Sequence, residues 1–348
     1  MTRLVTTGWE TGDVAEIGVA GGTSTQVVVT ATPTPRSPGS YCIKFGAASG
    51  NAYRDIVLPA ALTDVWVRFG LNTHALNVRT PFLQFVDSSG SGFQGTVAWD
   101  TDTFLKAYRG AQNGTLLGAS TNAWTQDQWR TVDVRWQITS TTVGIVEVWV
   151  DGTQWLNLTG VDNTNTTTAN VQTVRIGSFA SSFGATIWEA LDDLAVNDTA
   201  GTLNNARAGD GRVVLLKPNG AGSNTNQTRG GTDSGANWSQ CDELPPSLTD
   251  YVYSATAGTR DTYALEDLPA GTWTVNACEV LAYAQNSDAL AGSLGLTVKS
   301  GSTTNEGTAR TLSATAAYVR QLYETDPATS AAWTASAVNA LEAGTTVR

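Results

Sequence analysis

Acidic side chains are the first residues in this sequence whose type and spacing could support catalysis. A retaining glycosidase holds two carboxyl groups about 5–5.5 Å apart, and a strand provides this when both lie on one face. In the segment E-T-G-D-V-A-E, Glu10 and Glu16 share one face of an extended strand, whereas Asp13 falls on the opposite face. The segment WEALDD at 188–193 lacks a final Glu. Neither segment therefore predicts glycoside hydrolysis.

Other catalytic and cofactor motifs are missing from the sequence. His74 is the only histidine, which excludes a metal site with several histidine ligands. The sequence contains no G-x-S-x-G nucleophile elbow and no G-x-x-x-x-G-K-[ST] phosphate loop. Cys42, Cys241 and Cys278 lack C-x-x-C spacing and are expected to be reduced structural thiols. We therefore predict a protein without enzymatic activity and without a required cofactor.

Tryptophan is abundant, with 12 residues, and its flat ring can stack on a sugar. Trp124 and Trp155 lie beside predicted loops and Trp149 lies in a predicted strand, so these three residues are candidate carbohydrate-binding residues. The alternative is that the same rings fill the core, where an indole buries a large apolar area.

Oxygen-rich turns provide a second kind of candidate site. Calcium binds carboxylate and carbonyl oxygens, and Asp100, Asp102 and Asp162 lie in the turns DTDT and VDNTN. These three aspartates are the candidate calcium ligands. No complete D-x-D-x-D-G loop is present, and aspartate is common in β-turns because it bonds to its own backbone. The alternative, that these residues only form turns, is therefore favoured over calcium binding.

The charge of the chain limits its partners. There are 20 basic and 31 acidic residues, giving a net charge of −11. Nucleic-acid binders carry a basic surface and anionic membranes attract basic segments, so neither is an expected partner. No run of about 18 apolar residues predicts a membrane span. The N-terminal residues lack the apolar segment of a secretory signal, so we expect a chain that is not secreted through one.

Short strands are the elements that must position these residues. Alternating apolar and polar residues rich in Val, Ile, Thr and Trp predict strands between polar turns. Asp151 and Gly152 suit the positive-φ positions of a tight hairpin turn. In the first part of the chain the predicted strands are 64–71, 131–136, 145–152, 171–179 and 192–196.

The polar stretch 201–211 predicts a linker between a first domain, 1–200, and a second domain, 212–348. The tail after Pro327 is predicted as a short helix that ends near Gly344, or alternatively as an extended edge strand through TTV. The fold class is therefore all-β, with two β-sandwich domains and a short C-terminal helix as an option. Strands of the second domain are predicted at 212–218, 262–269, 272–285, 294–301 and 313–327.

Four segments of the first domain resemble the concanavalin A-like, laminin-G-like jelly-roll family. In order they are QWRTVDVRW with Trp129, VEVWVDG (146–152), VRIG (174–177) and LDDLAV (191–196). The resemblance implies a jelly roll of two antiparallel sheets, often with a rim or groove for carbohydrate or protein ligands.

The remaining segments look like the distal domain of structural proteins of tailed bacteriophages. They are GDGRVVLLKPNG (209–220), CDELPPSLTDYVYS (241–254), GTRDTYALEDLP (258–269) and WTASAVNALEAG (333–344), with GWETGD (8–13) at the start. This resemblance implies a virion component, and we predict a non-enzymatic, peripheral (minor) tail protein that contacts the host surface. The alternatives are a capsid decoration protein that staples shell subunits and a free carbohydrate-binding lectin.

The partners expected on this basis are other virion proteins, further copies of the same chain on the particle, and a glycan of the host surface. The expected location is the virion, assembled in the bacterial cytoplasm.

Overall fold

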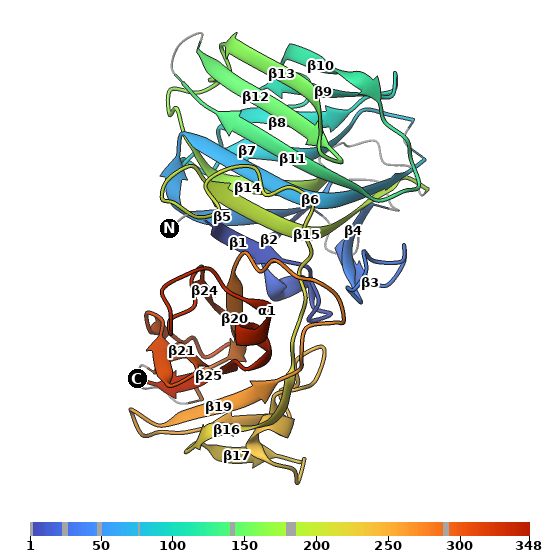
Figure 1. Cartoon of the computed structure of the whole chain (residues 1–348). Helices are drawn as coiled ribbons and strands as arrows, with labels where there is room; N and C mark the ends of the chain where they lie inside the picture. Colours follow the sequence, from blue (N-terminus) through green and yellow to red (C-terminus); the bar gives the residue numbers. More distant parts are fainter. Residues whose placement is uncertain are drawn as a thin grey trace. The chain divides into compact units, whose positions relative to one another are not determined.

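Antiparallel β-strands form nearly all of the regular structure of this chain (Figure 1). The computed structural model describes residues 3–22, 27–46, 51–75, 77–139, 143–178, 186–287 and 292–348. The chain divides into two units, Met1–Val213 and Val214–Arg348. The prediction of an all-β fold class is confirmed. Within the described ranges, no helix is long and apolar enough to cross a membrane.

The first unit is a sandwich of two antiparallel sheets. One sheet, here called the β6 sheet, consists of β1 (Arg3–Thr7), β3 (Val27–Thr30), β4 (Cys42–Gly46), β6 (Asp64–His74), β11 (Arg130–Gln137), β12 (Gly144–Val150), β13 (Thr153–Val161) and β15 (Trp188–Asp198). The other, here called the β7 sheet, consists of β2 (Val19–Gly22), β5 (Ala52–Leu62), β7 (Thr80–Val86), β8 (Phe93–Trp99), β9 (Phe104–Arg109), β10 (Thr115–Ala123) and β14 (Val171–Ser178).

The strand order defines which residues become neighbours. In the β6 sheet the order is β13-β12-β11-β6-β15-β4-β3, with β1 paired to β15. In the β7 sheet the order is β10-β9-β8-β7-β14-β5-β2. A short 3-10 helix, η1 (Val14–Glu16), occupies part of the E-T-G-D-V-A-E segment. The extended strand on which the prediction for these carboxylates depends is therefore absent. Glu10 and Glu16 are each buried.

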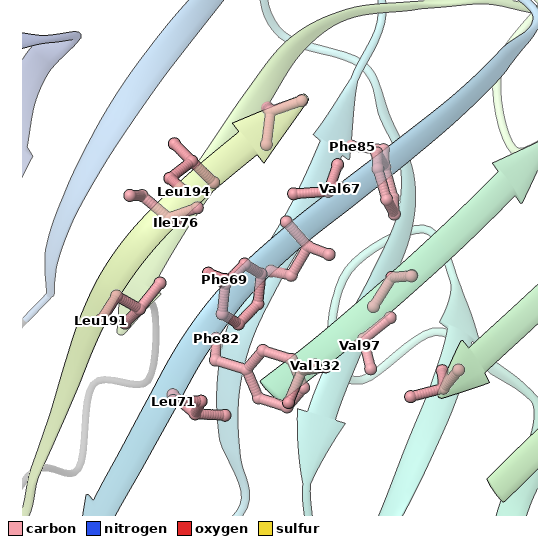
Figure 2. Packing of buried hydrophobic residues seen from close by; sticks show 14 of the residues in the cluster. Val67, Phe69, Leu71, Phe82, Phe85, Val97, Val132, Ile176, Leu191 and Leu194 are labelled. Carbon is pink, nitrogen blue, oxygen red and sulfur yellow. The ribbon is translucent and has the colours of Figure 1, made fainter. Parts of the chain in front are cut away.

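One apolar core fills the space between the two sheets (Figure 2). Its members come from alternate positions of the strands, because successive side chains of a strand point to opposite faces. The rings of Phe69 and Phe82 meet edge to face with centroids 6.0 Å apart. Trp136 packs on Phe85 with centroids 5.2 Å apart, and it needs glycine opposite: a Cβ on Gly95 would lie 1.9 Å from Trp136 Cζ2.

Residues 201–211, for which the sequence predicts a linker, belong to the first unit. Asn197 donates a hydrogen bond to the Ala206 carbonyl at 2.8 Å, and Gly209 N–H donates to Asp133 at 2.9 Å. Thr131 Oγ1 bonds to the Asp210 carboxylate at 2.7 Å. This segment is therefore held against the β6 sheet by its own polar contacts.

The second unit contains three antiparallel sheets within its described residues. Their orders are β16-β19-β25-β21-β22 with β23 on β21, then β17-β18, and β20-β24. The elements are β16 (Pro218–Thr225), β17 (Thr228–Gly231), η3 (Asn237–Gln240), β18 (Asp250–Tyr253), β19 (Arg260–Leu265), β20 (Cys278–Ala284), β21 (Ser293–Ser300), β22 (Thr303–Glu306), β23 (Arg310–Thr311), β24 (Ala317–Tyr323), α1 (Ala335–Asn339) and β25 (Glu342–Val347).

Two local predictions in this unit need correction. Residues 212–217 form no strand, and β16 instead starts at Pro218 and runs through the segment predicted as a loop. Proline is accepted there because the first position of an edge strand needs no N–H. The tail forms both the short helix α1 and the strand β25, and β25 lies between β19 and β21 rather than at an edge. Trp333, Val338 and Leu341 anchor this tail in a small core.

Candidate functional site

A row of polar side chains crosses the β7 sheet on the face turned away from the core. The core-facing positions of two neighbouring strands are occupied by residues such as Val97 and Ala107. The residues between them must point to the other face, because a strand alternates its side chains. Cross-strand pairing then aligns one residue from each of β5, β14, β7, β8 and β9. These five residues, here called the polar row, are Asp55, Arg175, Gln84, Thr96 and Tyr108.

Hydrogen bonds connect most of the polar row. Arg175 Nε and Nη2 bond to the two carboxylate oxygens of Asp55 at 2.7 and 2.9 Å, a bidentate arrangement that fixes the guanidinium plane. The same guanidinium lies 3.9 Å from the ring centroid of Tyr53. Gln84 accepts from Arg175 at 3.4 Å and donates to Thr96 Oγ1 at 3.0 Å. Gln84, Thr96 and Tyr108 are buried beneath their neighbours, whereas Asp55 and Arg175 are half-buried at one end of the row.

A charged cluster lies beside the Tyr108 end of the row. Asp100 accepts hydrogen bonds from Tyr108 Oη at 3.0 Å, Lys106 Nζ at 3.1 Å and Arg79 Nε at 3.0 Å. Burial acts to raise the pKa of Asp100, but the bonds from the Thr101 N–H, Arg79 and Lys106 outweigh it and hold this pKa at about 2. Burial, followed by the bond to Asp100, raises the pKa of Tyr108 above its usual range. Tyr108 therefore stays a neutral hydroxyl beside an ionised carboxylate.

The structure brings none of the predicted tryptophans to this face. Trp124 and Trp155 are 4% and 8% exposed, and they pack edge to face in the core with centroids 6.2 Å apart. Neither ring has a free face to stack on a sugar. Trp149 is half-buried, donates to Glu147 at 3.0 Å, and carries the Arg207 guanidinium 4.6 Å above its ring centroid.

The candidate calcium ligands are bonded to cations of the protein. Asp102 bonds to Lys106 Nζ at 2.6 Å, and Asp100 shares the same ammonium. Asp162 pairs with Arg109. In the described ranges, no group of three or more His, Cys, Asp or Glu side chains is arranged to hold a metal ion.

The predicted hairpin turn links β12 to β13. Asp151 and Gly152 have φ values of 48° and 79°, and Val150 pairs directly with Thr153. Asp151 also accepts from Thr131 N–H at 2.8 Å. The two residues thus form a structural turn.

A second polar cluster lies on the outer face of the β6 sheet. Arg36 bonds to Asp193 at 2.9 Å and to Asp210 at 2.5 Å, and its backbone N–H donates to Asp192 at 3.0 Å. Its side chain lies directly on the strand, because a Cβ on Gly70 would be 2.3 Å from Arg36 Cδ. This cluster joins the segments that contain Arg36 and Asp210 to β15 of the β6 sheet, so its charges have a structural role.

No protein-family model and no curated protein matches this chain. Among solved structures, the chain is similar to an endo-β-1,4-glucuronan lyase of the fungus Trichoderma reesei, with 13% identity, a TM-score of 0.42, and coverage of 56% of this chain and 95% of that one. It is similar to an alginate lyase, with 14% identity, a TM-score of 0.40 and coverage of 56% and 96%. A carbohydrate esterase from a Shiga toxin-encoding bacteriophage has 15% identity, a TM-score of 0.34 and coverage of 51% and 89%.

These findings contradict the prediction of a protein without enzymatic activity, because the similar structures are those of lyases and an esterase. That prediction rested on the absence of a small set of known catalytic motifs, and it is corrected here. The similarity assigns no reaction to this chain.

Proposed function

We propose that the first unit binds a polysaccharide along the polar row. The observation that carries the proposal is the alignment of Asp55, Arg175, Gln84, Thr96 and Tyr108 across neighbouring strands. Strands lie about 4.8 Å apart, so the row from β5 to β9 extends over about 19 Å. A polysaccharide is an extended chain of hydroxyl groups, and it needs donors and acceptors repeated along such a length.

The chemistry of the row fits hydroxyl groups. The pair of Arg175 and Asp55 offers donors and acceptors in fixed positions. Gln84 and Thr96 are buried and bond to each other and to Arg175, so they position the guanidinium and do not themselves face the sugar. Tyr108 is buried and its hydroxyl bonds to Asp100, so the donors that reach the surface at this end are Arg79 and Lys106. The aromatic ring of Tyr53 under the Arg175 guanidinium adds an apolar surface at one end.

Titration of the full chain with defined cell-wall and capsular polysaccharides tests this function. Arg79→Met and Arg175→Met remove guanidinium donors that reach the surface while nearly keeping side-chain length, and we expect binding at least ten-fold weaker in the double variant. Trp149→Ala is the matched control, and it should bind as the wild type. Unchanged binding by the double variant, with loss in Trp149→Ala, would place the glycan on the tryptophan instead.

The same titrations test calcium dependence and cleavage of the polysaccharide. Arms with calcium and with a chelator test the calcium prediction for Asp100, Asp102 and Asp162. Release of new chain ends from the polysaccharide would add cleavage to binding, and the Tyr108→Phe variant would then show whether the hydroxyl beside Asp100 takes part.

For the whole chain, we propose a virion protein of a tailed bacteriophage at a peripheral tail position, present in several copies. The support is the order of segments 209–220, 241–254 and 258–269 described above. Labelled antibody on purified particles should decorate the tail. Labelling of the capsid lattice would favour the decoration protein, and absence from particles would favour a free lectin.

A further inference from the structure

The second unit contains the single Asp-Pro peptide bond of the chain, between Asp326 and Pro327 in the turn that follows β24. The turn is closed by a β-bridge between Asp326 and Ala331, in which the Asp326 N–H donates to the Ala331 carbonyl at 2.9 Å. Asp326 is 4% exposed, Pro327 is half-buried, and residues 328–331 are exposed. The peptide bond therefore lies where the turn passes from the interior to solvent.

The Asp326 carbonyl oxygen accepts two backbone hydrogen bonds within this turn. The Ser330 N–H donates to it at 2.7 Å and the Thr329 N–H at 3.2 Å. Ser330 has a φ of 57°, which residues other than glycine seldom adopt, so the turn holds this N–H in a conformation that the chain would not favour by itself. Two N–H groups on one carbonyl oxygen stabilise the negative charge of a tetrahedral intermediate.

The Asp326 side chain is held against the same turn. Its Oδ1 accepts from the Ala328 N–H at 2.9 Å and its Oδ2 from Thr329 Oγ1 at 3.2 Å. Burial acts to raise its pKa, but bonds from the Ser300 hydroxyl, the Ala328 N–H and the Thr329 hydroxyl outweigh burial and lower this pKa. Burial, then the charge of Asp326, raises the pKa of the Cys278 thiol to about 12, so that thiol is neutral. In mild acid the carboxylate therefore stays ionised and nucleophilic.

Pro327 limits the reactions that are open to Asp326. After most aspartates the next backbone N–H can attack the carboxyl carbon and form a succinimide, but a proline nitrogen carries no hydrogen. The Asp326 carboxylate can instead attack its own main-chain carbonyl carbon and close a five-membered ring. Both groups belong to one residue, so they react at a high effective concentration.

We propose that the second unit cleaves its own chain between Asp326 and Pro327, with the Asp326 carboxylate as the nucleophile. A carboxylate oxygen bonds to the carbonyl carbon, and the carbonyl π pair moves to the oxygen that Ser330 and Thr329 hold. Collapse of this intermediate breaks the C–N bond, and the Pro327 nitrogen leaves with the electron pair and takes a proton from solvent. Water then hydrolyses the cyclic anhydride, which leaves two carboxyl groups on Asp326. Nothing is oxidised or reduced, and one water is consumed.

The fold keeps the two products together. Strand β25 lies between β19 and β21, and Trp333, Val338 and Leu341 are buried in the small core of this unit. Residues 327–348 therefore stay bound after cleavage, and the products separate only when the protein is denatured. The proposal concerns the second unit alone and is independent of the polar row.

The full chain is incubated at about pH 4.5, where solvent supplies the proton for the proline nitrogen, and its mass is measured after denaturation. We expect the products 1–326 and 327–348, whose masses together exceed that of the intact chain by one water. In urea at the same pH the bond lacks its two N–H donors, and we expect cleavage at least ten-fold slower. Hydroxylamine added to the folded protein should trap the anhydride as a hydroxamate on Asp326.

Two variants test the roles of the two residues. Asp326→Asn removes the nucleophile and should slow cleavage at least ten-fold. Pro327→Ala replaces the tertiary amide by a secondary amide, whose nitrogen is a poorer leaving group, and should also slow cleavage at least ten-fold. It keeps the test decisive if Asp326→Asn misfolds. The control is Asp267→Asn, which removes the same charge at an exposed position of this unit and should cleave at the wild-type rate.

Several outcomes would overturn the proposal. Equal rates in the folded chain and in urea would show ordinary acid hydrolysis, with no contribution from the turn. Unchanged cleavage in Asp326→Asn, or products free of hydroxamate when hydroxylamine is present, would exclude the anhydride route. A chain that stays intact while folded would show that the turn protects the bond instead of cleaving it.

Discussion

Glu189 shows at the residue scale how burial without a partner affects stability. Its side chain is 0% exposed, neither carboxyl oxygen has a hydrogen-bond partner among the residues that the structure describes, and burial raises its pKa well above the usual value. It shares the core side of β15 with Leu191, and Thr73 and Phe45 are its neighbours on the adjoining strands. A buried polar group without a partner costs about 1–3 kcal/mol.

We predict that Glu189→Leu raises the free energy of unfolding by about 1–3 kcal/mol at pH 7, measured by urea denaturation. The gain should be larger at pH 8 than at pH 5.5, because ionisation of the unfolded chain opposes folding of the wild type. Glu16→Gln is the comparison: Glu16 is also buried but accepts from Thr11 N and Oγ1 at 3.1 and 2.6 Å, so that change should destabilise. Destabilisation by both variants would contradict this explanation.

At the scale of elements, the Arg36 cluster keeps a covering segment on the β6 sheet. Arg36→Met removes the cation bonded to the buried Asp193 at 2.9 Å and leaves only Arg212 at 3.9 Å, and removing one partner of a buried pair costs about 3–5 kcal/mol. We predict this loss in urea denaturation, together with faster amide exchange over residues 207–213. Arg229→Met should change stability by no more than about 0.5 kcal/mol. Unchanged exchange at 207–213 would show that Arg36 does not hold the segment.

The sequence predicts the elements better than it predicts the site. The turn at Asp151 and Gly152 follows from local preference for positive φ, and strand alternation follows from local burial. The polar row depends on pairing between residues far apart in the chain: Arg175 and Gln84 are separated by 91 positions. Its only local sign is the alternation of Lys106 and Tyr108 with apolar neighbours.

The prediction for Trp124 and Trp155 uses their position beside loops, but that position does not determine which face of a sheet a ring occupies. Trp124 follows the end of β10, yet its indole N–H donates to Thr73 Oγ1 at 2.8 Å inside the sandwich. Only the packing of the two sheets reveals this. The surroundings of the candidate calcium ligands also depend on tertiary contacts. The sequence does not show that Lys106 bonds to both Asp100 and Asp102.

At the scale of the whole molecule, groups whose pKa is shifted in opposite directions together set the pH of maximum stability. Burial, then the charge of Asp193, raises the pKa of Asp192 to about 8. Burial is also the main cause that raises the pKa of Glu10 to about 7. Hydrogen bonds outweigh burial at Asp100 and Glu342 and hold both of these pKa values at about 2.

The sign of each contribution follows from linkage. A carboxyl with a raised pKa in the folded state stabilises fully below its unfolded pKa, and this stability is lost as pH rises toward the folded value. For Glu10 and Asp192 the loss falls between about pH 4.5 and pH 8. A carboxyl with a lowered pKa stabilises fully above its unfolded value, so Asp100 and Glu342 contribute without change across that range and lose their effect only in acid.

We therefore predict that the free energy of unfolding is highest near about pH 5 and falls steadily to pH 8, measured by urea denaturation at constant ionic strength. Glu10→Gln should flatten the decline below pH 7, because it removes the group whose pKa is about 7. Asp55→Asn, at a half-buried carboxylate paired with Arg175, serves as the control and should leave the slope unchanged. A stability that rises between pH 5 and pH 8 would mean that the buried carboxylates are ionised and neutralised by their arginine neighbours instead.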